Sequence, residues 1–200
     1  MPEPFKTLTA VAVPYDAINV DTDQIIPARF LKVPRNEGYG RFLFHDLRFR
    51  EDGAEVPGFV LNRAPYRDAR ILVANANFGC GSSREGAPYA FYDSGFRSVI
   101  APSFGDIFFN NCLKNGIVPV RLSDEICASL RNKLKAKPGM QITVDLEAQR
   151  VNGRHAFAID PFYREMLLQG VDEIGLTQTL LPKIEAFEQD YARTAPWVMR

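Results

Sequence analysis

Residues 70–85 read RILVANANFGCGSSRE, an apolar run followed by a glycine-rich turn and two serines. Residues 71–74 are expected to form a buried strand, and the turn after them leads into an expected helix start. In the order strand, loop, helix, backbone N–H groups at the helix start face a bound anion. The hydroxyls of Ser82 and Ser83 and the guanidinium of Arg84 therefore indicate a site for a small acid.

Short apolar strands and helical stretches alternate from residue 70 to residue 122. The expected strands are 71–74, 98–101 and 117–120, and the expected helices are 87–93 and 105–114. Strands this apolar, separated by helices, are typical of a parallel sheet covered on its faces. The sequence therefore predicts an α/β fold with a mainly parallel core sheet flanked by helices.

The remaining segments are expected to extend this sheet. Two strands, 141–146 and 154–159, are predicted to pair antiparallel around Asn152-Gly153, because this dipeptide is typical of two-residue hairpin turns. The other expected elements are a strand at 8–13, a helix from Ser123 to a stop at Pro138-Gly139, and helices at 161–169 and 181–191. Because no repeat, low-complexity tract or clear linker interrupts the chain, residues 1–200 are interpreted as a single domain.

Composition limits the function. The 200 residues are 46% hydrophobic, and 24 Lys plus Arg balance 24 Asp plus Glu, which argues against nucleic acid or an anionic membrane as partner. No apolar run approaches the roughly 20 residues of a spanning helix. Three widely spaced cysteines and the lack of a signal-peptide pattern favour the cytoplasm. Without a Cys-x-x-Cys pair or a Cys/His cluster, no metal site is expected in this chain alone.

The Ser82-Ser83-Arg84-Glu85 tetrapeptide also fits a capping box, which would make it purely structural. The glycines before it favour a ligand site, because glycine lets a ligand approach the backbone closely. Pro88 either kinks a helix begun at residue 83 or lies in the first turn of one begun later. The loop matches neither the dinucleotide nor the P-loop pattern, and it lacks the second glycine of a hydrolase elbow.

Other candidate groups have simpler interpretations. Asp21-Thr22-Asp23 lacks the ligand spacing of a calcium loop, and turn formation is favoured. Four basic residues lie on or just before a polar loop expected at residues 32–41. A solvated surface is the simplest interpretation of these cations, and selection of a carboxylated substrate is the alternative. They are Arg29, Lys32, Arg35 and Arg41. Structural or surface roles are expected for His45 and His155. Packing is expected for the cysteines, of which Cys80 is nearest the candidate site.

Four stretches, in this order, resemble the small subunits of isopropylmalate isomerases in the aconitase superfamily. They are NVDTDQIIP at 19–27, NFGCGSSRE at 77–85, IAPSFGDIF at 100–108 and DEIGLT at 172–177. The resemblance implies a swivelling three-layer β/β/α domain that closes over a separate large subunit. That large subunit would hold a [4Fe–4S] cluster, so no cofactor is expected on this chain. The implied reaction interchanges 2-isopropylmalate and 3-isopropylmalate by removing and re-adding water in leucine biosynthesis.

The resemblance also implies roles for residues of this chain. Ser82 would be the general base that removes the proton beside a carboxylate, provided that nearby positive charge and helix-terminal N–H groups stabilise its alkoxide. Ser83 and Arg84 would bind the substrate carboxylate, Arg84 through a bidentate fork. Lys32 and Arg35 lie where the family has its substrate-discriminating loop, and they are candidates for specificity.

One departure from the family pattern affects the substrate. The motif usually continues Arg-Glu-His-Ala, whereas this chain has Gly86 in place of the histidine. A paralogous hydro-lyase acting on another di- or tricarboxylate is therefore an open alternative. A non-catalytic carboxylate-binding module is a second one, because this chain alone would contain only half of a site.

Overall fold

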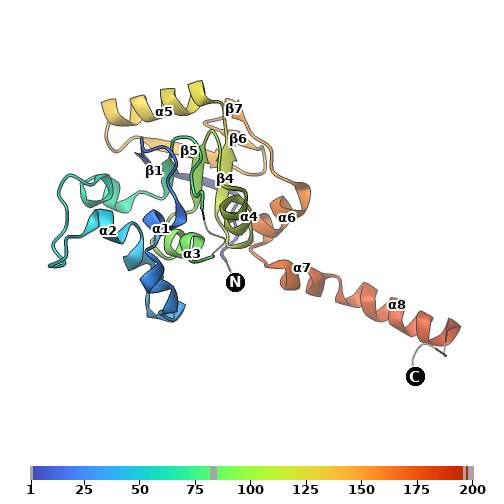
Figure 1. Cartoon of the computed structure of the whole chain (residues 1–200). Coiled ribbons are helices and arrows are strands. Elements are labelled where there is room, and N and C mark those ends of the chain that lie inside the picture. The colour runs from blue at the N-terminus through green and yellow to red at the C-terminus, as the bar shows by residue number, and fades with distance from the viewer. Residues whose placement is uncertain (1, 82–84, 196, 198–200) are drawn as a thin grey trace.

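The computed structural model describes residues 2–81, 85–195 and 197 of the chain (Figure 1). Within these residues, seven strands form a sheet in the order β4-β3-β2-β1-β5-β6-β7. The strands are β1 (Thr7–Pro14), β2 (Ile71–Val73), β3 (Ser98–Ala101), β4 (Val118–Arg121), β5 (Gln141–Asp145), β6 (Arg150–Val151) and β7 (His155–Ala156). The helices are α1 (Thr22–Ile25), α2 (His45–Arg48), α3 (Gly86–Asp93), α4 (Asp106–Lys114), α5 (Asp124–Ala136), α6 (Pro161–Gln169), α7 (Glu173–Thr179) and α8 (Leu181–Thr194).

Strands β2, β3 and β4 are parallel, as the sequence predicts, and β1 extends this parallel half by pairing with β2. Each residue of β2 and β3 is buried, because helices lie on both faces of this half of the sheet (Figure 1). Alternate side chains point to opposite faces of a strand. Ile71 and Val73 accordingly pack in the cluster that includes α5, whereas Leu72 packs in the cluster that includes α3 and α4.

The antiparallel half differs from the prediction in its pairing. Strand β5 pairs with β1 and with β6, and β7 pairs only with β6, so segment 154–159 does not pair directly with segment 141–146. The physical reason is a tight turn after β5, in which Asp145 Oδ1 accepts from the N–H of Ala148 at 2.7 Å and Gln149 has a φ of 50°. This turn returns the chain into β6 before the Asn152-Gly153 hairpin. Both hairpin residues have left-handed φ angles, as expected for that turn.

Helix boundaries follow local chemistry. Ser123 caps α5, and Gly170 ends α6 with a φ of 69°. Helix α3 begins at Gly86, so Pro88 lies in its first turn, where a missing N–H costs little. Helix α7 was not expected from the sequence; the carboxylate of Asp172 caps it by accepting from the N–H of Gly175 at 2.6 Å.

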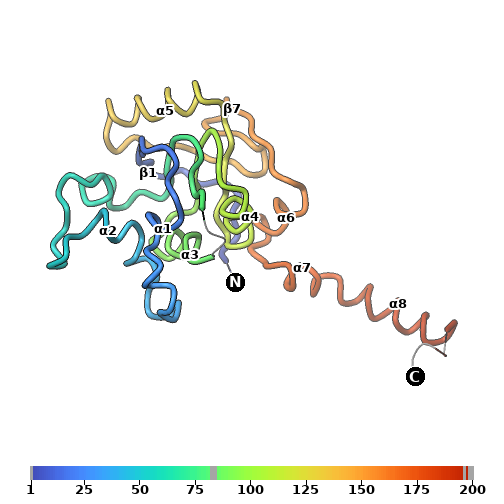
Figure 2. The backbone as a smooth tube through the Cα atoms, in the orientation of Figure 1, coloured from blue at the N-terminus to red at the C-terminus, as the bar shows by residue number. Residues whose placement is uncertain are grey.

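The last two helices leave the body of the molecule. Helices α7 and α8 extend away from the sheet and its covering helices (Figures 1 and 2). Helix α8 exposes apolar side chains, among them Phe187, which is 65% exposed. None of the helices in the described ranges combines the length and the apolarity needed to cross a membrane.

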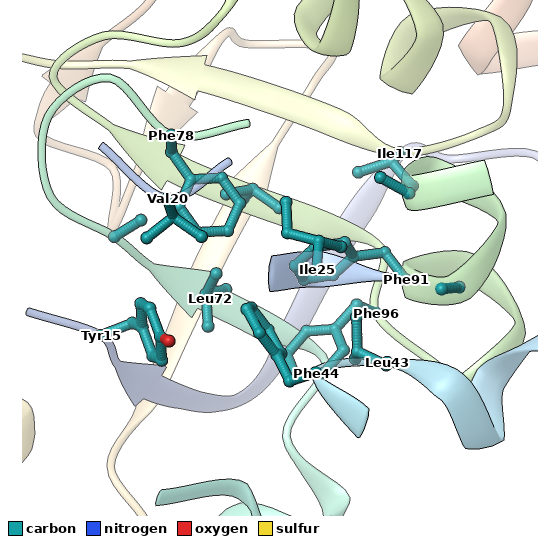
Figure 3. Close-up of a cluster of buried hydrophobic side chains, with 14 of the residues drawn as sticks. Tyr15, Val20, Ile25, Leu43, Phe44, Leu72, Phe78, Phe91, Phe96 and Ile117 are labelled. Carbon is teal, nitrogen blue, oxygen red and sulfur yellow. The ribbon is translucent and has the colours of Figure 1, made fainter. Parts of the chain in front are cut away.

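A cluster of aromatic rings fills the core between the sheet and α3 (Figure 3). Phe91 of α3 is fully buried at its centre. Centroid distances of 5.4 to 6.1 Å separate its ring from those of Phe44, Phe78, Phe96 and Phe108. Because these rings come from segments far apart in the chain, the cluster joins the N-terminal loops, the NFGCGSSRE motif at 77–85 and α4.

We expect Phe91→Ala to lower the free energy of unfolding by about 3–5 kcal/mol, because truncation leaves a cavity among four rings. The control is Phe187→Ala at an exposed ring, which should change this free energy by less than about 0.5 kcal/mol. Urea denaturation followed by circular dichroism measures both. Equal losses for the two variants would contradict the central position of Phe91.

Candidate functional site

Three of the motif segments meet beyond the carboxyl ends of β1, β2 and β3. The backbone of residues 20–22 runs beside residues 79 and 80: the N–H of Gly79 donates to the Val20 carbonyl at 2.7 Å, and the N–H of Thr22 donates to the Cys80 carbonyl at 2.9 Å. These bonds form a parallel bridge between Asp21 and Cys80. In open α/β sheets, ligands bind outside the carboxyl ends of the strands.

The third segment joins on the other side of the turn. The N–H of Phe78 donates to the Ser103 carbonyl at 3.1 Å, and the N–H of Gly105 donates to the Phe78 carbonyl at 3.0 Å. The side-chain hydroxyl of Ser103 accepts from the N–H of Asn77 at 2.8 Å. The turn at 77–81 is therefore held by backbone bonds from both flanking loops.

Two glycines permit this close approach. Gly79 has a φ of +72°, and a Cβ there would overlap the ring of Phe108. A Cβ on Gly105 would overlap the carbonyl oxygen of Gly79, which belongs to the backbone and cannot rotate away. Any larger residue at either position would push the turn out of place.

Asp21 has a structural role. Its Oδ1 accepts from the N–H of Gln24 at 2.7 Å, and the Gln24 side chain accepts from the N–H of Asp21 at 3.3 Å, which forms a capping box for α1. The expected bonding of the Asp21 side chain to nearby backbone is confirmed, but the segment after it is the short helix α1 and not a turn. In the part of the chain that the structure describes, no group of three or more His, Cys, Asp or Glu residues is placed to hold a metal ion.

The predicted base Ser82 and the carboxylate ligands Ser83 and Arg84 lie outside the described residues. Their two flanking residues are described. Gly81 ends the turn with a φ of +96°, and Glu85 stands directly before α3. The alternative of a capping box at 82–85 falls on the same residues and lies outside the described part of the chain. Helix α3 is described from Gly86, and the Glu85 carboxylate accepts from the hydroxyl of Tyr89, one helical turn further along α3.

Gly86, at the position where the family resemblance implies a histidine, is buried, and its neighbours belong to residues 26–39. A Cβ at this position would overlap Cδ2 of Leu31 and would lie 3.7 Å from side-chain carbons of Ile26 and Tyr39. Leu31 belongs to a short 3-10 helix, Ala28–Lys32. An apolar side chain therefore fills the space into which a larger residue at position 86 would project.

The two basic candidates of the polar loop have different surroundings. Arg35 donates from Nη2 and Nε to the carboxylate of Asp93 at 2.8 and 3.1 Å, and its guanidinium carbon lies 4.1 Å from the centroid of the Tyr89 ring. Lys32 is exposed, and its ammonium makes no hydrogen bond or ion pair with the described residues. Of the two, Lys32 has the charge that is free to meet a ligand.

The DEIGLT motif at 172–177 overlaps α7 and lies close to Glu85 at the start of α3. Lys114 at the end of α4 pairs with Glu173 at 2.9 Å, which raises the pKa of the lysine. A hollow of about 270 Å³ lies beside this pair. Its lining residues are Glu85, Lys114, Asn115, Met166, Asp172, Glu173 and Ile174. The motifs at 77–85 and 172–177 thus contribute residues to the same surface hollow.

Two residues of this region escaped sequence reasoning. Tyr89 follows Glu85 by four positions, a spacing that places two side chains on one helix face and was the available signal. Lys114 was noted only as the end of the helix expected at 105–114, and nothing in the sequence marked its partner Glu173. Burial and the hydrogen bond to Glu85 raise the pKa of Tyr89 to about 12, so its hydroxyl remains a donor at neutral pH.

The cysteines and histidines occupy the structural roles expected for them. Cys112 and Cys127 are buried and free, whereas Cys80 is half-buried in the turn of the site. His45 lies beside aromatic rings, and its Nδ1 is 3.1 Å from the Asp46 carboxylate. His155 lies on the short strand β7.

Comparison with known proteins establishes the family. A protein of Paramagnetospirillum magneticum named 3-isopropylmalate dehydratase small subunit is 52% identical over 200 residues, covering 98% of this chain and 100% of the relative. The chain belongs to the 3-isopropylmalate dehydratase small-subunit family. A member from Brevibacillus brevis is 49% identical over 92% of this chain and 97% of its own length. The family model described as Aconitase C-terminal domain matches residues 2–125, and the one described as LeuD_N matches residues 128–161.

The fold agrees with this family. A crystal structure of 3-isopropylmalate dehydratase from Methanocaldococcus jannaschii superposes with a TM-score of 0.64 at 25% identity. The likeness covers 90% of this chain and 99% of the other. The overall fold is thus shared with a solved structure named 3-isopropylmalate dehydratase (leuD).

We expect Gly105→Ala to lower the free energy of unfolding by about 1–3 kcal/mol, because its Cβ would overlap the backbone at Gly79 and the turn must shift. Gly58→Ala is the matched control, since no atom lies within 4 Å of its Cβ position. Urea denaturation of the two variants, with hydrogen exchange at the amides of residues 78–81, measures the effect. Unchanged stability and exchange in Gly105→Ala would contradict the close approach.

Proposed function

We propose that this chain is the small subunit of a hydro-lyase that interconverts 2-isopropylmalate and 3-isopropylmalate in leucine biosynthesis. The observation that carries the proposal is the convergence of residues 20–22, 77–81 and 103–105 at the carboxyl edge of the sheet. The Ser82-Ser83-Arg84 tripeptide connects that edge to α3. The names of relatives about 50% identical over nearly the whole chain support the same activity.

In the proposed reaction, Ser82 acts as the base. Its alkoxide takes the proton from the carbon beside a substrate carboxylate, the C–H electron pair forms the double bond, and hydroxide leaves the adjacent carbon. Water then adds back to the double bond, with the hydroxyl on the carbon that lost the proton and the proton on the carbon that lost the hydroxide, which gives the isomer. A serine alkoxide needs positive charge close by, and Arg84, two residues along, is the group proposed to supply it.

Substrate binding is proposed for four further positions. Ser83 and Arg84 would hold a carboxylate, because a guanidinium fork matches its two oxygens. Lys32 would meet the other end of the substrate, since its ammonium makes no hydrogen bond or ion pair with any residue that the structure describes. Arg35 would contribute to a lesser degree, because a substrate carboxylate must compete with Asp93 for its guanidinium.

A large subunit is the proposed partner, and a [4Fe–4S] cluster on it would assist departure of the substrate hydroxyl. The described residues of this chain offer no grouping of side chains suited to hold such a cluster, so the proposal assigns it to the partner. A cytoplasmic location is part of the proposal, because the three cysteines are free thiols and a reducing compartment preserves them.

A second candidate keeps the chemistry and changes the acid. It is favoured by Gly86, which stands where the family resemblance implies a histidine, and by Leu31, which occupies the space that a side chain at position 86 would need. A paralogous hydro-lyase acting on another di- or tricarboxylate would use the same base and the same carboxylate ligands.

Reconstitution with the cognate large subunit tests the two candidates. We expect the complex, assembled anaerobically, to interconvert the two isopropylmalates and to turn over citrate-like, malate-like and maleate-like acids much more slowly. Absorbance of the unsaturated acid formed by dehydration follows the reaction. Turnover of another acid without isopropylmalate turnover would favour the paralogous enzyme, and carboxylate binding without any turnover would point to a non-catalytic module.

We expect Ser82→Ala to lower kcat of the complex by about 10²- to 10⁴-fold with little change in KM, because a general base contributes that much to the rate. Ser129→Ala, an exposed serine on α5, is the control and should leave kcat unchanged. Steady-state kinetics on purified complexes measures both. Full turnover by Ser82→Ala would refute the assignment of the base.

A further inference from the structure

Helix α3 carries contacts that connect the polar loop to the candidate site. Glu85, Tyr89 and Asp93 follow one another at intervals of four residues, so their side chains lie along one face of the helix. The Tyr89 hydroxyl donates to the Glu85 carboxylate. Asp93 accepts two hydrogen bonds from Arg35 of the loop. Between these two bonds lies the ring of Tyr89.

Tyr89 makes contacts in both directions. Its ring supports the guanidinium of Arg35 at 4.1 Å from the centroid, and the ring of Tyr39 meets it edge-on at 6.2 Å and 74°. A guanidinium this close to an aromatic face is attracted by the ring. Arg35 is therefore fixed by charge on one side and by the ring on the other, and both supports come from α3.

The loop follows α3 over its whole length. At the start of the helix, Leu31 packs on Gly86. At its end, a Cβ on Gly40 would overlap the carbonyl of Asp93, so the backbones are in close contact there. The loop at residues 28–42 and helix α3 thus form one packed unit. Within this unit, the hydroxyl of Tyr89 donates to Glu85, the residue directly after the Ser82-Ser83-Arg84 tripeptide.

We propose that Tyr89 is a positioning residue for the reaction: its hydroxyl fixes Glu85, and its ring fixes the Arg35 loop, so that one side chain aligns the two halves of the substrate site. This inference rests on the proposed function. Before the tripeptide, Cys80 is held by the bridge to Asp21, and directly after it, Glu85 is held by the bond from Tyr89, so these two residues would serve as its anchors. Loss of the second anchor misplaces the base, and small misplacements of catalytic groups slow the chemical step strongly.

The two functions of Tyr89 can be separated by substitution. Tyr89→Phe removes the hydroxyl and keeps the ring under Arg35, so we expect kcat of the complex to fall roughly three- to tenfold with KM within about twofold of wild type. Tyr89→Leu removes both, so kcat should fall at least as far and KM should rise. The control is Tyr92→Phe on the same helix, which loses only a bond to the backbone N–H of Glu3 and should leave both constants unchanged.

A double-mutant cycle distinguishes positioning from a general loss of stability. If Tyr89 acts through Glu85, Tyr89→Phe should lower kcat in the wild type but change it by less than about 1.5-fold in a Glu85→Ala background, because the bond is already absent there. Constants are expressed per assembled complex. Equal losses in the two backgrounds, or a wild-type kcat for Tyr89→Phe, would overturn the inference.

Failure of the inference and failure of the proposed function give different results. A wild-type complex that is inactive on both isopropylmalates would refute the proposed function before any variant is compared. An active wild-type complex with an unaffected Tyr89→Phe variant would refute only the role of Tyr89. Hydrogen exchange at the amides of residues 28–42 provides a readout that does not depend on turnover. The exchange rate should be unchanged in Tyr89→Phe and faster in Tyr89→Leu. If Tyr89→Leu also leaves the exchange rate unchanged, the ring of Tyr89 does not support the loop.

Discussion

The backbone hydrogen bonds between residues 20–22 and residues 79–80 are the constraint on which the site depends. They lock the loop after β1 against the loop after β2, and the loop after β3 closes on the same turn from its other side. Close packing around this turn leaves no room for a Cβ at either glycine: at Gly105 it would overlap the backbone of Gly79, and at Gly79 it would overlap the ring of Phe108. The glycines of two separate motifs thus let a backbone and an aromatic ring pack directly against the turn at the edge of the sheet.

A second layer of contacts builds outward from this turn. Helix α3 follows the Ser82-Ser83-Arg84 tripeptide, buries Phe91 among four aromatic rings and presents Tyr89 and Asp93 to the polar loop, while Glu85 before its start accepts from Tyr89. One helix therefore ties the hydrophobic core to the polar face of the site. Core packing fixes the position of α3, and α3 in turn fixes both the end of the tripeptide and the loop at residues 28–42.

Prediction from the sequence succeeded where a signal is local. The buried strand at 98–101 and the helix at 161–169 have their predicted bounds, because an apolar run marks the strand and Asp160, Pro161 and Gly170 mark the helix ends. It failed where pairing or contact depends on distant residues. The Asn152-Gly153 turn was recognised, but its strand partner was wrong, because a tight turn at 145–149 inserts β6. Helix α7 is short and polar, and it escaped notice.

The sequence by itself determined the fold class, the family motifs and the residue types of the candidate site, because strand periodicity, glycine turns and helix caps are encoded over a few neighbouring residues. Only the tertiary structure decided that Arg35 is bound to Asp93 while Lys32 makes no bond with the described residues, that Leu31 fills the space beside Gly86, and that the ring of Tyr89 lies against the guanidinium of Arg35. These contacts arise between segments up to 58 positions apart. The packing of one element on another sets them, and that packing leaves no local mark in the chain.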